Sequence, residues 1–170
     1  MKAAAELYDT ELLAFAAITI FAGLRPDSEM RHLKWESISF EDEEIRVIKG
    51  KTRTPRTVEI PKNLISWLKI CDQSLPIFPD GFRYKWAAVR NAAGFKGGAA
   101  KTRTKKAAEV RLKPWIKDYT RHTAISHRVR QTGDIHKTAT WAGNSPAIIR
   151  SHYLGLVSRS VTADFWSIHP

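Results

Sequence analysis

The sequence lacks the residues that would place it in several common classes of protein. It has a single cysteine, Cys71, so it can form no internal disulfide and no cysteine-based zinc cluster. Its longest strongly apolar run, residues 12–24, is interrupted by Thr19 and Gly23 and is too short to cross a bilayer. Met1 and Lys2 are not followed by the apolar segment of a signal peptide. We therefore expect a soluble, cytoplasmic protein.

Acidic residues are scarce in the larger, C-terminal part of the chain. Residues 1–48 hold five of the 28 basic residues and ten of the 17 acidic ones, so residues 49–170 carry 23 basic residues against seven acidic ones. A positive surplus of this size attracts polyanions, of which DNA and RNA are the most common. A basic surface that serves only solubility is the alternative. The few acids suggest no close carboxylate cluster for two metal ions, and no phosphate-binding G-x-x-x-x-G-K-[ST] loop is present, which disfavours a metal nuclease.

The hydrophobic pattern predicts a mostly helical α+β domain with a small three-stranded antiparallel sheet. Alternating apolar residues predict the strands around Ile38 and Phe40, Ile45 and Val47, and Val58 and Ile60. We expect helices over residues 8–22, with Asp9 or Thr10 as its cap, then 26–35, 61–70, 81–94, 118–130, 134–141, 145–153 and 158–168. Residues 94–113 are rich in Gly, Ala and Lys and are expected to form a mobile connection.

Two arginines occupy positions where local structure does not require a cation. Arg25 lies in the tight "GLRP" junction, which needs glycine and proline but no guanidinium. Arg121 lies in the first turn of a predicted helix, where a positive charge opposes the helix dipole. Each arginine alone is more often an ion-pair partner. Together, in a basic domain, they indicate an anion nearby.

Five segments resemble a known family in their order and in their approximate separations. They are "FAGLRPDSEMRHLKWESI", "IKGKTRTPRTVEIP", "DYTRHTAIS", "WAGNS" and "IIRSHY". This set is similar to the catalytic domain of the tyrosine recombinases, also called phage-type integrases, over nearly the whole chain. The resemblance implies that Arg25 and Arg121 are the two catalytic arginines, that Lys51 is the lysine of the sheet hairpin, and that Tyr153 is the nucleophile. Read alone, Tyr153 is an aromatic residue at the edge of the core.

Two further catalytic positions depart from the family's pattern. Asp118 stands where the family usually has histidine, and Asn144 stands where it usually has histidine or tryptophan. Asp118 could instead cap a helix, orient Arg121 or accept the tyrosine proton, and Asn144 could donate a hydrogen bond to a phosphate oxygen or serve a turn. A helical neighbour points about 100° away, so we do not expect His122 or His152 to replace the missing histidines.

The chemistry expected of these residues is the breaking and rejoining of a phosphodiester. Tyrosine attacks the phosphorus, two planar guanidiniums stabilise the growing charge on the phosphate, and lysine protonates the leaving 5′-oxygen. The 3′-phosphotyrosyl bond conserves the energy of the original linkage, so we expect no cofactor. Double-stranded DNA is the expected partner, with contacts from two basic segments: Lys49, Arg53 and Arg56 in the hairpin, and Lys101, Arg103, Lys105 and Lys106 in the connection. Lys49 and Arg53 compete with Lys51 for the catalytic role.

We expect residues 1–170 to form one catalytic domain, without the N-terminal core-binding domain that the family usually carries. The apolar stripe of residues 158–168 is expected either to pack on its own domain or to join copies of the chain on DNA. Two rival functions remain at this stage. One is a non-catalytic or degenerate DNA-binding remnant of the same fold, and the other is relaxation of supercoils in the manner of a type IB topoisomerase.

Overall fold

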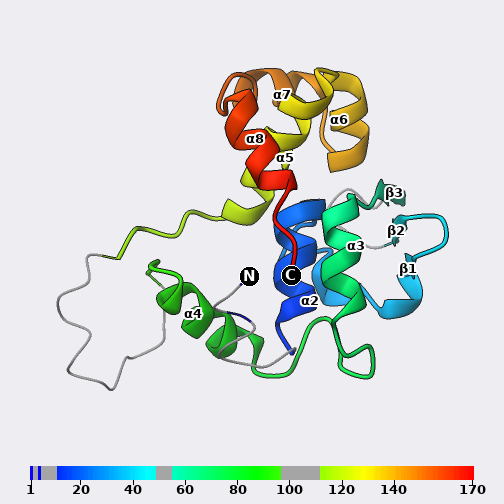
Figure 1. The fold of residues 1–170 in the computed structure, drawn as a ribbon, viewed down its shortest axis with the longest axis vertical. Helices are drawn as coiled ribbons and strands as arrows, with labels where there is room; N and C mark the ends of the chain where they lie inside the picture. The colour runs from blue at the N-terminus through cyan, green and yellow to red at the C-terminus, as the bar shows by residue number, and fades with distance from the viewer. Residues whose placement is uncertain (2–3, 5–10, 49–54, 97–111) are drawn as a thin grey trace.

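The computed structural model describes residues 1, 4, 11–48, 55–96 and 112–170 (Figure 1). The fold is α+β and mostly helical, as predicted, with helices gathered around a central buried helix and a small sheet at one side (Figure 1). Helices α5 to α8 lie together at one end of the molecule, and α4 lies apart from the sheet (Figure 1). Within the described ranges, none of the helices is long and apolar enough to span a membrane.

The central helix is buried because nearly all of its residues are apolar. It starts as α2, Leu13–Ala17, and continues as a π-helical segment, η1, Ile18–Ala22. Gly23 ends it in the left-handed conformation, with φ at +62°. A Cβ atom at Gly23 would lie 3.0 Å from the Cβ of Ala124, so a glycine allows α5 to approach closely. The predicted helix is confirmed from residue 13 onward, whereas its expected caps, Asp9 and Thr10, lie outside the described residues.

The helix expected over residues 26–35 is wrong. Turns lead into two 3₁₀-helical segments, η2, Met30–His32, and η3, Trp35–Ser37. Two features explain the difference. The Glu29 carboxylate accepts the backbone N–H of Arg25 and so forms a closed turn, and the backbone is extended at Leu33, which interrupts the helical hydrogen bonds.

The predicted three-stranded antiparallel sheet is confirmed. Its strands are β1, Ile38–Ser39, β2, Glu44–Val47, and β3, Arg56–Glu59, in the order β1-β2-β3. Ile45 pairs with Ile38 on one side and with Val58 on the other, so these three apolar side chains share the buried face. The chain from β2 to β3 passes through residues 49–54, which lie outside the described residues.

The remaining helices start and end within a few residues of their predicted bounds. They are α3, Lys62–Lys69, α4, Phe82–Ala92, α5, Tyr119–Thr132, α6, Ile135–Ala142, α7, Pro146–His152, and α8, Arg159–Trp166. The side chains of Asp134, Ser145 and Ser158 accept backbone N–H groups in the first turns of α6, α7 and α8, which fixes where these helices start. Most of the expected connection over 94–113 falls outside the described residues.

The C-terminal helix packs on its own domain. Phe165 of α8 contacts Phe21 of η1, with ring centroids 5.3 Å apart, and stacks on His127 of α5 at 4.0 Å. After α8, the indole nitrogen of Trp67 donates a hydrogen bond to the carbonyl oxygen of Ile168. The apolar stripe predicted for residues 158–168 is thus partly buried within the same chain.

Candidate active site

Arg25 is the second residue after Gly23, where the chain leaves η1. Its Nη1 donates a hydrogen bond to Glu29 Oε1 at 2.7 Å. Its Nη2 donates to the carbonyl oxygen of Gly143 at 3.0 Å and to Oδ1 of Asn144 at 3.1 Å. The side chain keeps 16% of its surface exposed. The guanidinium is therefore fixed by several partners and still reaches the surface.

Arg121 lies in the first turn of α5 and is only 4% exposed. Its Nη1 donates to the carbonyl oxygen of Gly23 at 2.6 Å. Its Nη2 donates to the carbonyl oxygen of Ala142 at 2.5 Å and to Asn144 Oδ1 at 3.1 Å. Within the described residues, no carboxylate lies within ion-pair distance of Arg121. This buried cation is therefore held by neutral acceptors.

The electrostatics of the arginine pair favour a bound anion. Burial, followed by the positive charge of Arg25, lowers the pKa of the Arg121 guanidinium to about 10, and the negative charge of Glu29 opposes this shift. The guanidinium remains charged at neutral pH. An anion placed between the two arginines would offset both causes of the shift. The pair is therefore suited to a phosphate group, which accepts hydrogen bonds from a guanidinium in pairs.

Asn144 joins the two arginines. It follows Gly143, which ends α6 in the left-handed conformation, and its backbone N–H bonds to the carbonyl oxygen of Ala139. Because both of its partners are cationic donors, the side-chain oxygen must face them. Its Nδ2 has no hydrogen-bond partner among the described residues. Asn144 thus holds both arginines with its oxygen and leaves its nitrogen able to donate to an anion.

Tyr153 lies at the end of α7 and is 5% exposed. Burial raises the pKa of its hydroxyl, and the negative charge of Asp118 adds to this, whereas the positive charges of Arg121 and Arg25 oppose it. The structure therefore brings Tyr153 within electrostatic reach of both arginines and of Asp118. These are four of the six residues assigned catalytic roles from the sequence, and Asn144 is a fifth.

Asp118 does not cap α5 with its side chain. It occupies the position before the first helical residue, but its φ is +57° and its side chain makes no capping hydrogen bond. Positive φ is uncommon outside glycine and is best tolerated by Asp and Asn. The hydrogen bonds of Arg121 go to Gly23, Ala142 and Asn144, so the expectation that Asp118 caps the helix or orients Arg121 is not met.

Arg56 is not placed as a DNA-contacting residue of the hairpin. Its Nη1 and Nη2 donate to the two carboxylate oxygens of Glu29 at 2.6 and 3.0 Å, and its side chain is 10% exposed. Arg56 is therefore a partner of a buried acid rather than an exposed cation. The other six basic residues expected to contact DNA, together with Lys51, lie outside the described residues: Lys49, Arg53, Lys101, Arg103, Lys105 and Lys106.

Sequence reasoning missed two residues of this site. The Glu29 side chain is fully buried and pairs with both Arg25 and Arg56. Burial alone would raise the pKa of the Glu29 carboxyl, but the hydrogen bonds and charge of Arg56 outweigh it, so the pKa is lowered. The imidazole of His122, which we expected to point away, stacks on the ring of Tyr153. An acid in the same turn as Arg25 was a signal for Glu29, whereas no local signal points to the His122 contact.

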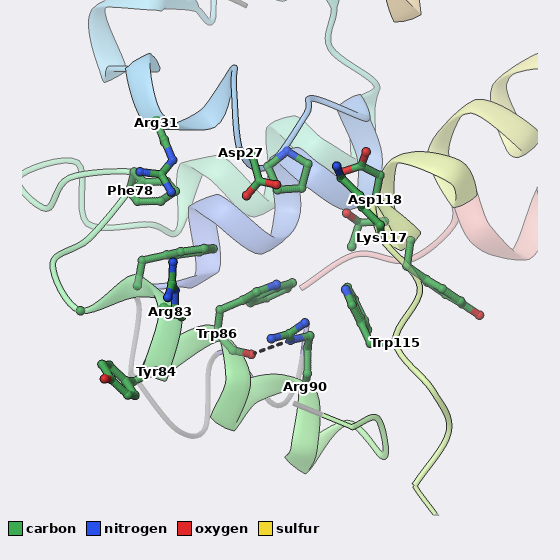
Figure 2. A pocket seen from close by; sticks show the side chains of 15 residues that line it. Asp27, Arg31, Phe78, Arg83, Tyr84, Trp86, Arg90, Trp115, Lys117 and Asp118 are labelled. Carbon is green, nitrogen blue, oxygen red and sulfur yellow. Dashed lines mark hydrogen bonds between the residues drawn. The ribbon is translucent and has the colours of Figure 1, made fainter. Parts of the chain in front are cut away.

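A cavity of about 580 Å³ is lined by the turn after Arg25, helix α4 and the start of α5 (Figure 2). The Arg90 guanidinium lies over the Trp115 ring at 5.3 Å and donates to the carbonyl oxygen of Trp86. Acids on this wall are Asp27 and Asp118, and its cations are Arg31, Arg83, Arg90 and Lys117. Within the described residues, no group of three His, Cys, Asp or Glu side chains could hold a metal ion.

Solved structures with similar folds include recombinases and an integrase. The chain is similar to the XerA recombinase with a TM-score of 0.60 and 17% identity, over 96% of this chain and 59% of that one. It is similar to the XerH site-specific recombinase, bound to a palindromic difH substrate in a post-cleavage complex, with a TM-score of 0.59 and 16% identity, over 96% of this chain and 48% of that one. The Tn1549 transposon integrase, in complex with a circular intermediate DNA, gives a TM-score of 0.56 and 13% identity, over 91% and 58% of the two chains.

The fold is therefore that of a tyrosine recombinase catalytic domain. Residues 1–75, which hold the first two of the five segments, match the sequence model of the phage integrase family, and the predicted resemblance is confirmed for this part and for the fold. The matched part contains Arg25 and Glu29, whereas Arg121, Asn144 and Tyr153 follow it. The chain spans about half to three fifths of the length of the structures it matches. A comparison with curated proteins found no match.

Proposed function

We propose that this chain is the catalytic domain of a site-specific DNA recombinase or integrase that breaks and rejoins DNA through Tyr153. The observation that carries the proposal is the shared contact of Arg25 and Arg121 with Asn144 Oδ1, each at 3.1 Å. The positive charges of both arginines also act to lower the pKa of the Tyr153 hydroxyl. A buried arginine pair next to an oxygen nucleophile is what attack on a phosphodiester requires.

In the proposed reaction, the scissile phosphate binds between Arg25 and Arg121 and displaces part of their contact with Asn144. The Tyr153 oxygen attacks phosphorus, a bond to the 5′-oxygen breaks, and a 3′-phosphotyrosyl bond forms. The tyrosine proton passes to solvent, and the 5′-oxygen takes a proton from the ammonium group of Lys51 in the hairpin, which becomes neutral. Asn144 donates from Nδ2 to a non-bridging oxygen. Rejoining is the reverse reaction, with the 5′-hydroxyl as the attacking group.

The arginines act mainly in the transition state. Charge on the phosphate oxygens grows as phosphorus becomes five-coordinate, so guanidiniums that the carbonyl oxygens of Gly143 and Ala142 already hold in place stabilise it with little further movement. The same cations favour the ionised form of Tyr153, against the burial and the Asp118 charge that raise its pKa. Phosphate binding and nucleophile activation are therefore coupled through Arg121.

Double-stranded DNA is the proposed partner, and the relatives in complex with DNA support this. The cavity between α4 and the start of α5 adds Arg31, Arg83 and Lys117 together with aromatic side chains, a combination that contacts phosphates and bases in nucleic-acid complexes. Self-association on DNA through the C-terminal segment stays a prediction. It would use the exposed Val161 of α8 and the exposed Ile168 just after that helix, or would require α8 to leave its own domain.

The test is to mix the protein with duplexes that carry a nick near the cleavage position and to look for a covalent protein–DNA adduct on a denaturing gel. We expect an adduct with the unaltered chain and none with Tyr153→Phe, which keeps the ring but removes the attacking oxygen. Tyr119→Phe is the matched control, because Tyr119 lies on the neighbouring helix α5, and it should still form the adduct. An adduct that persists in Tyr153→Phe would show that another residue is the nucleophile.

A non-catalytic DNA-binding remnant is the second candidate. The observation in its favour is the position of Asp118, whose negative charge opposes both phosphate binding and ionisation of Tyr153. This function predicts salt-sensitive binding to duplex DNA with no adduct on any nicked substrate. Asp118→His, which restores the residue usual in the family, would then be expected to give an adduct where the unaltered chain gives none.

A further inference from the structure

Arg56 is the first residue of β3 and follows directly after the hairpin that carries Lys51. Its guanidinium forms a two-pronged ion pair with Glu29, and its Nε donates to the carbonyl oxygen of Trp141 at 3.2 Å. Arg56 therefore connects three separate parts of the chain: strand β3, the turn after Arg25 and the end of α6.

The fit of Arg56 depends on Gly143. A Cβ atom at Gly143 would lie 3.1 Å from Nε and 3.2 Å from Cδ and Cζ of Arg56, which is closer than side chains normally pack. Gly143 also has φ at +64°, a conformation that favours glycine. The missing side chain thus allows the flat guanidinium to lie against the turn between α6 and α7, the turn that presents Asn144.

Three consecutive carbonyl groups at the end of α6 each accept a hydrogen bond from a different arginine. Trp141 accepts from Arg56, Ala142 from Arg121, and Gly143 from Arg25. The last carbonyls of a helix lack partners within the helix and carry partial negative charge, so they bind cations well. The position of this turn and the positions of the three guanidiniums therefore determine one another.

We propose that Arg56 is a positioning residue for the arginine pair. It acts through Glu29, which in turn holds both the backbone N–H and the Nη1 of Arg25, and through the carbonyl oxygen of Trp141, which fixes the turn that carries Asn144. Within the described part of the chain, its hydrogen bonds and ion pairs go to Glu29 and Trp141 and not to Tyr153. This inference rests on the proposed function, because the pair it positions is the phosphate clamp.

A second arginine provides a matched control. Arg128 also connects β3 to α6: its side chain is 7% exposed, it pairs with Glu59 of β3, and its guanidinium lies over the Trp141 ring at 5.4 Å. Within the described residues, it forms no hydrogen bond or ion pair with Glu29, Arg25 or Asn144. Arg56→Met and Arg128→Met thus remove similar buried arginines, and only the first reaches the clamp.

The test has two arms. The first measures the rate of adduct formation in a single turnover at saturating nicked duplex, together with the affinity for that duplex. We expect Arg56→Met to lower the rate on the order of ten- to a hundredfold at nearly unchanged affinity, because small misplacements of positioned groups are costly in rate. Arg128→Met should stay within about twofold of the unaltered chain. Equal losses in the two variants would overturn the proposal.

The second arm does not depend on activity. Side-chain NMR signals of ¹⁵N-labelled arginine report on Arg25 and Arg121 directly, and we expect them to shift or broaden in Arg56→Met but not in Arg128→Met. Unmoved signals in Arg56→Met would overturn the positioning role. If the unaltered chain forms no adduct while these signals do move, the proposed function fails and the structural coupling stands.

A double variant separates positioning from stability. Arg56→Met removes one partner of the buried Glu29 carboxylate. Adding Glu29→Gln replaces the charged carboxylate with a neutral amide, whose burial without that partner costs less stability. We expect Glu29→Gln with Arg56→Met to recover much of the lost melting temperature but not the cleavage rate.

Arg56→Lys keeps the charge without the two-pronged geometry and should recover the rate only in part. It also serves as the test if Arg56→Met does not fold. If the cleavage rate of the double variant, Glu29→Gln with Arg56→Met, recovered together with its melting temperature, Arg56 would contribute only to stability and the positioning role would be wrong.

Discussion

The imidazole of His122 stacks on the phenol ring of Tyr153, with the ring centroids 5.4 Å apart and the ring planes 25° from parallel. His122 is itself exposed, so it covers one face of a tyrosine that is otherwise enclosed by the protein. Burial is the largest cause of the raised pKa of Tyr153. The stacked histidine is therefore expected to hold the proposed nucleophile in its protonated form.

His122→Ala tests this relationship. Removing the ring should let water reach Tyr153 and lower the pKa of its hydroxyl towards the ordinary value of 10. The measurement is a spectrophotometric titration of tyrosinate, with Tyr153→Phe in the same background to identify the signal of Tyr153. An unchanged pKa would mean that groups other than His122 bury the hydroxyl.

Asn144→Asp is expected to separate stability from phosphate binding. A carboxylate in place of the amide would pair with Arg25 and Arg121, so the free energy of unfolding should be retained or increased. The same negative charge should repel a phosphate and abolish the adduct. Asn144→Leu should instead lower the free energy of unfolding by about 1–3 kcal/mol, because two arginine N–H groups lose their acceptor. Chemical denaturation and the adduct assay measure the two effects, and a stable, active Asn144→Asp would contradict them.

Gly143→Ala and Gly133→Ala form a matched pair. Both glycines end helices with positive φ, +64° and +67°, so alanine should cost about 1–2 kcal/mol of unfolding free energy at either position. Nothing lies within 4 Å of a Cβ built at Gly133, whereas at Gly143 the Cβ meets the side chain of Arg56. We therefore expect only Gly143→Ala to reduce adduct formation as well. The same loss of activity in Gly133→Ala would show that backbone strain alone is responsible.

The pKa of Glu29 predicts how stability changes in acid. Its folded-state pKa lies below the ordinary value of 4.5, so Glu29 contributes stability that is fully present above that pH and is lost as the pH falls through the folded-state value. Glu29→Gln removes this titration, so its stability should fall less steeply below pH 4.5 than that of the unaltered chain. Urea denaturation at a series of acidic pH values measures the difference. Parallel curves for the two chains would contradict the assignment.

Much of the fold followed from local patterns. The sheet was predictable because Ile38, Ile45 and Val58 alternate with polar residues, and α6 and α7 were predictable because Asp134 and Ser145 are strong caps. The turn at 26–35 was not, since its shape depends on a carboxylate that turns back to bind Arg25 rather than on helix propensity.

The site was predictable only in part, for a related reason. Arg25, Arg121 and Tyr153 stood out by position and by their resemblance to a family. The pairing of Glu29 with Arg56 joins residues 27 positions apart, and the hairpin position of Arg56 suggested an exposed cation. Contacts of that kind depend on how β3, α6 and the turn after η1 pack together, so no local sequence pattern predicts them.

The π-helical segment η1 has a consequence for how this chain can change. A π turn takes in more residues than an α turn, so a continuous α-helix over residues 13–22 would leave the end of the helix rotated about its axis. Gly23 and Arg25 would then face a different direction, away from Arg121. Deleting a single residue within 18–22 would compensate for this rotation, because a π turn spans one residue more than an α turn. A continuous α-helix could therefore keep Gly23 and Arg25 facing Arg121 only with a shorter chain in this stretch.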